Sequence, residues 1–232
     1  MDRYVRWMRQ GYLSPTGVCF DIGMTVRTAL RDYELTGNPF AGRDDPRTAG
    51  NGGLMRLCPV VMFFQADPTQ AEHFAVESTR TTHAAPEALD CSRLMARVLC
   101  RALGGLSKKE VLAPSSDGIA SPKVAEIARG AYLDKSRAQI AGTGYAVASL
   151  EAALWCFHTT DSFKDAVLAA ANLGDDADTT AAIVGQIAGA YYGLDAIPES
   201  WRDRLHQGTE IAALGRRLGA GSAHGPSAAP PA

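Results

Sequence analysis

The amino-acid sequence predicts an all-α protein that forms a single compact multi-helix domain. Apolar residues recur at helical spacing along most of the chain, and proline, glycine and small polar residues stand where such stretches begin and end. No segment shows a convincing strand-like alternation of apolar and polar residues. A chain of 232 residues is long enough to bury a sizeable core.

The helical stretches follow one another with recognisable boundaries. The first ten residues read as part of a helix, and the clearest amphipathic stretch is opened by Pro86 and closed by Gly104 and Gly105. Asp161 and Ser162 form a plausible cap before Phe163. In the stretch from Thr180 onward, Gly185 and Gly189 lie four apart on one face, where another helix can approach closely. The remaining helices are expected at 124–132, 145–157, 163–173, 180–192 and 210–218.

Two segments are less regular. The apolar run Cys58 to Phe64 is the best strand candidate, although a buried helix fits it equally well. The last residues, 219–232, are rich in Gly, Ser, Ala and Pro and are expected to be disordered, with His224 exposed rather than a ligand. The expected domain therefore spans 1–218.

Composition excludes several classes of partner. The formal net charge is only −2, so no basic surplus exists to recruit nucleic acid or an anionic membrane, and no apolar run approaches the roughly 20 residues of a membrane span. The start lacks the apolar core of a secretory signal. The five cysteines are scattered without paired spacing, which indicates reduced core thiols in the cytoplasm rather than disulfides or zinc ligands.

An acidic cluster precedes the glycine- and alanine-rich helix. Asp175, Asp176 and Asp178 fall within four residues, followed by Thr179 and Thr180. One such side chain would suffice to cap the helix, whereas three mutually repelling carboxylates suit a hard divalent cation such as magnesium, manganese or calcium. Both capping and metal binding remain open at this point. An EF-hand loop is excluded, because counted from Asp176 its glycine and glutamate positions hold alanine and isoleucine.

A glycine-rich segment and a histidine are further candidates. Residues 49–56 place three glycines around Asn51, so their backbone could approach a ligand and offer free N–H groups to a phosphate. A plain turn between two elements explains the same glycines. His83 ends a Thr-rich run, and for a lone histidine a cap or a satisfied buried contact is the simpler interpretation. No arrangement favours a covalent nucleophile.

Taken together, these segments resemble the ADP-ribosylglycohydrolase family, which is all-helical and includes dinitrogenase-reductase-activating glycohydrolase. The resemblance runs from about residue 4 to 218 as an ordered series of motifs. The last two, Gly-Gln-Ile-Ala-Gly-Ala-Tyr-Tyr-Gly at 185–193 and Ile-Pro-Glu-Ser-Trp at 197–201, are highly specific together; the others lie at 4–7, 19–23, 50–56, 82–83, 144–145, 150–157 and 172–180.

The resemblance implies roles for particular residues. Asp176, Asp178 and Thr179 match the C-terminal ligands of a two-magnesium centre, which manganese could also occupy, and Asp175 would contribute only indirectly. Two cations would hold the vicinal hydroxyls of the distal ribose and polarise a water for attack. The residues implied to bind ADP-ribose are Thr48, Ala49, Gly50, Asn51, Gly53, His83, Gly144 and Tyr145.

Other family motifs have no counterpart here. Relatives carry a Gly-Asp-Ala segment and a Thr-Asp-Asp-Thr run upstream of the helix with which this chain begins, and Asp44-Asp45 lacks the flanking threonines. The catalytic acidic residue is expected in that absent segment, which the coding frame upstream of Met1 is expected to supply as about 50–80 residues.

The resemblance therefore implies a magnesium-dependent hydrolase that removes ADP-ribose from modified side chains or small conjugates. Two alternatives stay open. A catalytically incomplete relative would only bind ADP-ribose or serve a structural role. A magnesium-dependent phosphohydrolase would instead cut the pyrophosphate, yielding AMP and ribose phosphate rather than intact ADP-ribose.

Overall fold

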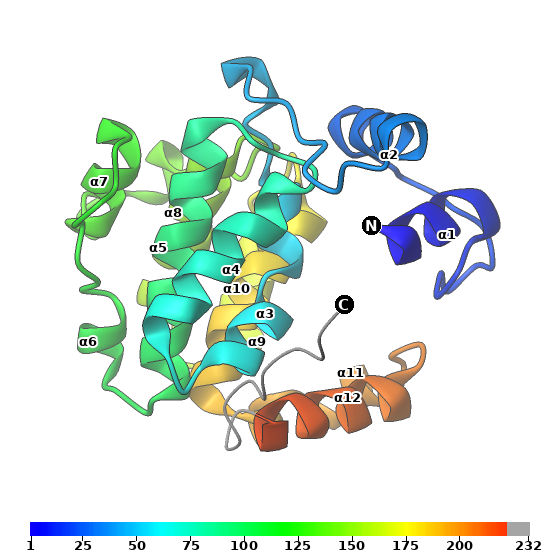
Figure 1. Ribbon diagram of the computed structural model, residues 1–232. Coiled ribbons are helices and arrows are strands. Elements are labelled where there is room, and N and C mark those ends of the chain that lie inside the picture. Colours follow the sequence, from blue (N-terminus) through cyan, green and yellow to red (C-terminus); the bar gives the residue numbers. More distant parts are fainter. Residues whose placement is uncertain (222–232) are drawn as a thin grey trace.

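The computed structural model describes residues 1–221 and is helical throughout, which confirms the predicted all-α class (Figure 1). Within those residues the only β-type pairings are two isolated bridges, Arg43 with His83 and Gly50 with Tyr145. The α-helices are α1 Asp2–Gln10, α2 Met24–Thr36, α3 Cys58–Phe64, α4 Pro68–Arg80, α5 Pro86–Leu103, α6 Lys108–Val111, α7 Pro122–Ala128, α8 Ala146–His158, α9 Phe163–Ala171, α10 Ala177–Tyr192, α11 Glu199–Arg202 and α12 Gly208–Gly221. Short 3₁₀ segments are η1 Pro46–Thr48, η2 Asn51–Arg56, η3 Arg137–Gln139 and η4 Leu194–Ala196.

Helix α5 lies at the centre of the body and packs against α4, α8 and α10. It carries the largest set of buried residues of any helix, including the fully buried Leu94, Met95 and Leu99. On the other side α10 packs against α9 and α8, and the buried ring of Phe157 meets Tyr191 and Tyr192 edge-on. The body therefore has one continuous core that fixes the start of α10 relative to α5 and α8.

Several predicted helix boundaries are confirmed by their local chemistry. Pro86 occupies the first turn of α5, and Gly104 stands at its C-terminal end. At the start of α9 the Ser162 hydroxyl accepts a hydrogen bond from the backbone N–H of Asp165, so Ser162 is the cap and its neighbour Asp161 is not. Helix α4 is capped in the same way by Asp67.

Other boundaries differ from the sequence-based prediction. The run Cys58–Phe64 is helix α3, not a strand, because Pro59 is compatible with the first turn of a helix and the run packs against α4, α5 and α12. Helix α7 ends at Ala128, and Tyr132 is buried in the turns that follow. Helix α12 spans Gly208–Gly221 and so continues three residues beyond the predicted helix end at 218. Residues 222–232, with His224, lie outside the described part of the chain.

The cysteines agree with the prediction of free thiols. Within residues 1–221, Cys91 and Cys156 are buried, while Cys19, Cys58 and Cys100 are partly buried, and none forms a disulfide. Burial raises the pKa of the Cys58 and Cys100 thiols to about 11. These thiols are therefore protonated and poorly nucleophilic at neutral pH.

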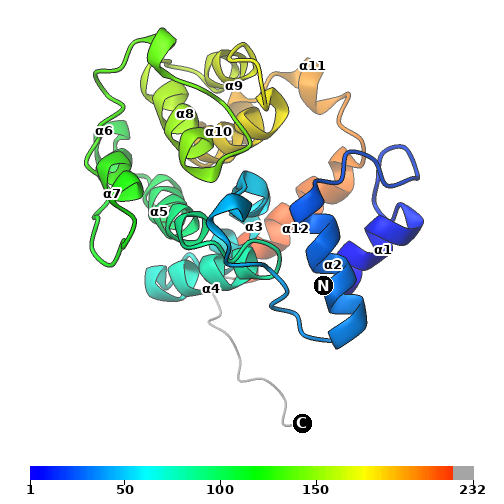
Figure 2. The same ribbon diagram turned by 90° about the horizontal axis from the view of Figure 1, so that it is seen from above.

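Helices α1 and α2 are packed far less tightly than the body. Figures 1 and 2 both show them side by side at one edge of the molecule, and α1 has no buried residue. Arg9 and Glu34 join the two helices through a bidentate ion pair at 3.0 and 2.7 Å. Among residues 1–221, no helix combines the length and apolar character that crossing a bilayer requires.

Gly185 and Gly189 of α10 face α9, as their spacing predicts, but neither position excludes a larger side chain. A Cβ at Gly185 would lie 3.8 Å from Val167 Cγ2, which is an ordinary van der Waals contact. We expect Gly185→Ala to stabilise the fold by about 0.5–1 kcal/mol, because alanine has the higher helix propensity. Urea unfolding measures this change.

Gly42→Ala is the matched control for that substitution. Its Cβ would stand 2.5 Å from the backbone oxygen of Arg80, so it should lower the free energy of unfolding. Equal effects of the two variants would contradict this account of the α9–α10 contact.

Candidate functional site

Two segments far apart in the sequence meet backbone to backbone at the glycine-rich segment. The Asn51 N–H donates to the Gly144 carbonyl at 3.0 Å, and the Ala146 N–H donates to the Ala49 carbonyl at 2.9 Å. Gly50 and Tyr145 form the isolated bridge between these bonds. The residues implied for substrate binding at 49–51 and at 144–145 are therefore brought together.

The side chain of Asn51 connects this junction to the acidic cluster. Its Nδ2 donates to Asp176 Oδ2 at 2.6 Å and to Ser149 Oγ at 3.2 Å, and it lies 3.4 Å from the Thr143 carbonyl. Asn51 is buried. Helix α8, the glycine-rich segment and the start of α10 therefore meet at one amide group.

The acidic cluster forms the start of α10. Asp176 stands at the N-cap position, yet its side chain accepts no capping hydrogen bond, and its own N–H donates to the Gly142 carbonyl at 2.9 Å. Asp178 Oδ1 accepts only from the N–H of the adjacent Thr179 at 2.7 Å. Capping by Asp176 is therefore the wrong explanation for this carboxylate, which binds Asn51 instead.

The donor set suits a hard cation but is incomplete. Asp176 Oδ1 and Asp178 Oδ2 accept no hydrogen bond from the described residues, so two carboxylate oxygens are available to a ligand. Oxygen donors of this kind fit magnesium, which keeps several waters when few carboxylates bind it. Within residues 1–221, however, no group of three or more His, Cys, Asp or Glu side chains is placed to hold a metal.

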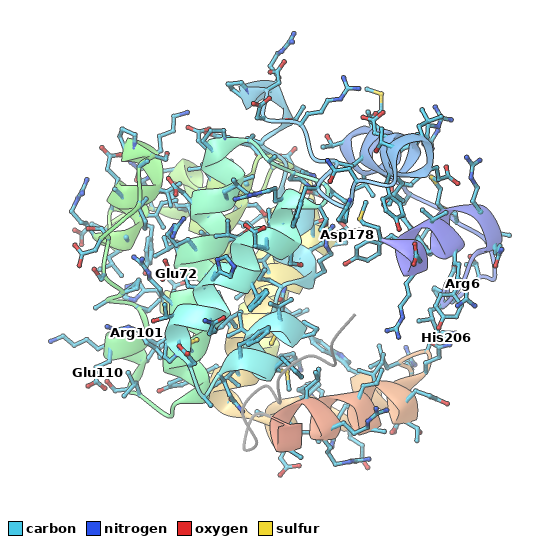
Figure 3. The ribbon with its side chains drawn as sticks, in the orientation of Figure 1. Arg6, Glu72, Arg101, Glu110, Asp178 and His206 are labelled. Atoms are coloured by element: carbon cyan, nitrogen blue, oxygen red, sulfur yellow. The ribbon has the colours of Figure 1, made fainter. Side chains whose placement is uncertain are left out.

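Asp178 faces the same side of the molecule as α1 and α2. Figure 3 shows it toward those helices, away from the labelled Glu72, Arg101 and Glu110. Asp175 is exposed next to it, with a left-handed backbone (φ 50°). The exposed carboxylates of the acidic cluster, Asp175 and Asp178, therefore lie on the less densely packed side of the fold.

The His83 ring packs closely against the glycine-rich segment. A Cβ on Gly52 would lie 2.7 Å from its Cε1 atom, and one on Gly50 would lie 3.1 Å from its Nε2 atom. A Cβ on Gly53 would meet the Thr79 side chain at 2.5 Å. Gly52 and Gly53 therefore serve close internal packing.

The backbone N–H groups of this segment are less available than the sequence suggests. Gly50 N–H donates to the Thr48 carbonyl at 2.7 Å, and Asn51 N–H is taken by Gly144. The Thr48 hydroxyl donates to backbone carbonyls of Arg43 and Asp45. Two of the N–H groups of the segment that was expected to offer free donors to a phosphate, those of Gly50 and Asn51, are therefore already engaged.

The contacts of Thr82 favour one tautomer of His83. Arg56 Nη2 donates to Thr82 Oγ1 at 2.7 Å, so the Thr82 hydroxyl hydrogen is free to be donated to His83 Nδ1, 2.8 Å away. The remaining proton of the ring then lies on Nε2, beside Gly50. Burial, and then the charge of Arg56, lower the pKa of His83 to about 4.

Sequence reasoning missed the partners of Tyr145. Its hydroxyl donates to Glu87 and accepts from Lys123 Nζ at 2.9 Å, while Lys123 and Glu87 form an ion pair at 3.1 Å. The hydrogen bond from Tyr145, and then the contacts with Lys123, lower the pKa of Glu87. No local signal marks Glu87 or Lys123, whereas Ser149 could have been noticed as a polar residue in an apolar helix.

The pKa of His83 predicts how stability depends on pH. Its folded value of about 4 lies below the unfolded value near 6.5, so the unfolded chain binds the proton more readily. The stability that this difference provides is fully present above pH 6.5 and is lost as pH falls toward 4, by up to roughly 3 kcal/mol. Urea unfolding between pH 7.5 and 4 measures it.

In that titration His83→Asn should flatten the pH dependence, because asparagine keeps an acceptor for Thr82 but takes up no proton. His73→Asn, at an exposed position of α4, is the control and should retain the parent slope. If both variants retain the parent slope, His83 does not titrate as described.

Comparison with known proteins shows that the chain is similar to ADP-ribose hydrolases. The family model described as ADP-ribosylglycohydrolase matches residues 1–227. An ADP-ribosylarginine hydrolase, Tri1, of Pseudomonas putida is 42% identical over 92% of this chain and 57% of its own length. The ADP-ribosyl-[dinitrogen reductase] glycohydrolase of Rhodospirillum rubrum is 28% identical over 82% of this chain and 62% of its own.

A solved structure titled ADP-ribosylglycohydrolase-related protein complex superimposes with a TM-score of 0.83 and 39% identity, covering 95% of this chain and 72% of that one. The chain thus spans about three fifths of the length of the curated relatives it matches. Its helices, its acidic cluster at the start of α10 and these similarities together show that the chain belongs to the ADP-ribosylglycohydrolase family.

Proposed function

We propose that this chain carries the ADP-ribose-binding and magnesium-binding half of a hydrolase that removes ADP-ribose from arginine side chains. The observation that carries the proposal is the contact between Asn51 and Asp176, because it joins the glycine-rich segment to the acidic cluster. The arginine linkage is suggested by the Pseudomonas putida relative and by a second ADP-ribosylarginine hydrolase, from Serratia proteamaculans, that is 39% identical.

In this proposal Asp176, Asp178 and Thr179 hold a magnesium ion, and manganese could replace it. When bound, such an ion supplies electrostatic stabilisation and a hold on neighbouring ribose hydroxyls. Asn51 orients the Asp176 carboxylate by donating to Oδ2, which leaves Oδ1 for the cation.

The other residues of the site would bind and orient ADP-ribose. A neutral His83 would offer an Nε2–H donor beside Gly50. Tyr145, which follows Gly144 in the sequence, would contribute a hydroxyl that Glu87 and Lys123 hold in place. Thr48, Ala49 and Gly53 would contribute their backbone groups. The Thr48 hydroxyl already donates to the Asp45 carbonyl, and Gly53 already packs against the Thr79 side chain. The substrate would be an ADP-ribosylated protein or a small ADP-ribose conjugate.

A catalytically incomplete, ADP-ribose-binding protein is the second candidate. It is favoured by the partial donor set, since Asp176 and Asp178 are not joined by a third acidic or histidine ligand within residues 1–221. Binding of ADP-ribose without turnover would distinguish this candidate from the hydrolase.

We predict that magnesium stabilises the folded chain through Asp176 and Asp178. A cation that binds only the folded state adds about 1.4 kcal/mol when its concentration is ten times its Kd. Thermal unfolding with and without magnesium measures the shift, which Asp176→Asn and Asp178→Asn should abolish. Asp175→Asn is the matched control and should respond like the parent. An undiminished response in the first two variants would exclude these carboxylates as ligands.

We further predict slow, linkage-selective turnover by this chain alone. Release of ADP-ribose from an arginine-linked peptide should exceed release from a serine-linked one and should require magnesium. The rate should lie at least about a hundredfold below that of the Pseudomonas putida relative, equivalent to about 2.7 kcal/mol in the barrier, because two-metal clamping of the ribose is unavailable. Chromatography of the products measures both rate and bond cleaved.

Two results of that assay would contradict the proposal. AMP and ribose phosphate as products would indicate pyrophosphate cleavage. Rapid release by the isolated chain would show that the ligands described here are sufficient.

A further inference from the structure

The hydroxyl group of Tyr145 lies where three helices meet. Tyr145 stands at the N-cap of α8, Glu87 lies in the first turn of α5, and Lys123 belongs to α7. These helices contact one another and lie side by side in Figures 1 and 2. The Tyr145 hydroxyl donates to the Glu87 carboxylate and accepts from Lys123 Nζ at 2.9 Å. We call Glu87, Lys123 and Tyr145 the tyrosine cluster.

Helix α7 is attached to α5 by a buried carboxylate. Asp90, one turn after Glu87 on α5, accepts hydrogen bonds from the backbone N–H groups of Ala120 and Ser121 at 2.9 and 2.7 Å. Ser121 caps α7, two residues before Lys123. The side chains that hold the Tyr145 hydroxyl therefore come from elements fixed to the well-packed body.

The charges of the tyrosine cluster fix the direction of its hydrogen bonds. The contacts with Tyr145 lower the pKa of Glu87 and raise that of Lys123, and the ion pair at 3.1 Å acts in the same sense on both groups. At neutral pH Glu87 is a carboxylate that only accepts hydrogen bonds, and Lys123 is an ammonium group that only donates them.

The hydroxyl of Tyr145 therefore has no proton left for a ligand. Its single hydrogen is committed to Glu87, whereas its oxygen has two lone pairs, of which Lys123 takes one. Tyr145 can offer a ligand the remaining lone pair only, as a hydrogen-bond acceptor.

Tyr145 adjoins the carboxylate that is proposed to hold the cation. A Cβ on Gly144, the preceding residue, would lie 3.7 Å from Asp176 Oδ2. Gly144 is exposed and Tyr145 is half-buried, so a ligand can reach both. In the proposed function the cation at Asp176 holds the distal ribose, and the bond to be cleaved joins this ribose to the modified side chain.

Arginine and serine linkages present different hydrogen-bonding groups at that bond. The guanidinium of a modified arginine is a cation with several N–H donors. A modified serine is joined through an oxygen that carries no hydrogen, so it can only accept a hydrogen bond. An acceptor-only hydroxyl complements the arginine linkage and offers nothing to the serine linkage.

We propose that the Tyr145 hydroxyl accepts a hydrogen bond from the guanidinium of arginine-linked ADP-ribose, and that Glu87 is the positioning residue that gives the hydroxyl this polarity. The inference rests on the proposed function and adds to it a residue that determines linkage specificity. Glu87 and Lys123 lie outside the motifs that carry the family resemblance.

The affinities of two peptides test the proposal, one carrying ADP-ribose on arginine and the other on serine in the same sequence. Isothermal titration calorimetry with the whole chain and magnesium gives the ratio of the serine-linked Kd to the arginine-linked Kd, which should exceed one. Tyr145→Phe keeps the ring but loses the acceptor, so it should lower this ratio about tenfold. A general loss of packing would weaken both peptides and leave the ratio unchanged.

Variants of the two charged residues should change the ratio in opposite directions. Glu87→Ala releases the hydroxyl proton for donation to the serine linkage, so the ratio should fall and the serine-linked peptide should bind more tightly than it does to the parent. Lys123→Met frees the second lone pair and removes a like charge near the guanidinium, so the ratio should rise about two- to threefold. Tyr192→Phe, at the other end of α10 from the acidic cluster, is the control and should keep the parent ratio.

The outcomes separate this inference from the proposed function. A parent chain that binds neither peptide nor free ADP-ribose would contradict the proposed function and the inference with it. If the parent binds both peptides but Tyr145→Phe leaves the ratio unchanged, the inference alone is wrong. A ratio that falls in both Glu87→Ala and Lys123→Met would also overturn it, because the cluster would then serve only to hold the three helices together.

Discussion

The hydrogen bond from Asn51 to Asp176 is the contact on which the rest of the candidate site depends. It is a charge-assisted bond of 2.6 Å between residues 125 apart in the sequence, and bonds of this type contribute about 1.5–3 kcal/mol. It directs one carboxylate of the acidic cluster toward the glycine-rich segment, where Ser149 of α8 also meets the same amide. Without it, nothing in the described residues would hold the Asp176 side chain, since the carboxylate does not cap its own helix.

The glycines of this region serve internal packing. Gly52 lies too close to the His83 ring for any side chain, and Gly53 lies equally close to Thr79 of α4. These contacts pack the 3₁₀ segment against the end of α4 and the residues that follow it. Asn51 in this segment is buried, which keeps its amide away from competing water. The segment is therefore shaped by internal packing, and a ligand would find the N–H groups of Gly50 and Asn51 already engaged.

Arg56 connects this interior to the less densely packed edge of the fold. It lies three residues after Gly53, donates a hydrogen bond to the Thr82 hydroxyl next to His83, and also lines the pocket beside α1. Packing around α5 and α10 is complete, whereas α1 buries none of its residues. The candidate site thus lies at the boundary between the well-packed body and an open apolar surface. Arg56 contacts residues on both sides of this boundary.

The all-α class and the main helices could be predicted from local signals in the sequence. Proline at the start and glycine at the end delimit α5, and Ser162 caps α9, because these effects act within one turn of the backbone. The clustering of Asp175, Asp176 and Asp178 was equally visible. Only the tertiary structure decided that Cys58–Phe64 is a helix, since an unbroken apolar run has no period that separates helix from strand. It also decided that Asp176 binds Asn51, that Gly144 takes the Asn51 N–H, and that Glu87 and Lys123 hold Tyr145. Those contacts join segments that are far apart in the sequence. Their geometry depends on how α5, α8 and α10 pack together, and this packing cannot be predicted from local sequence patterns.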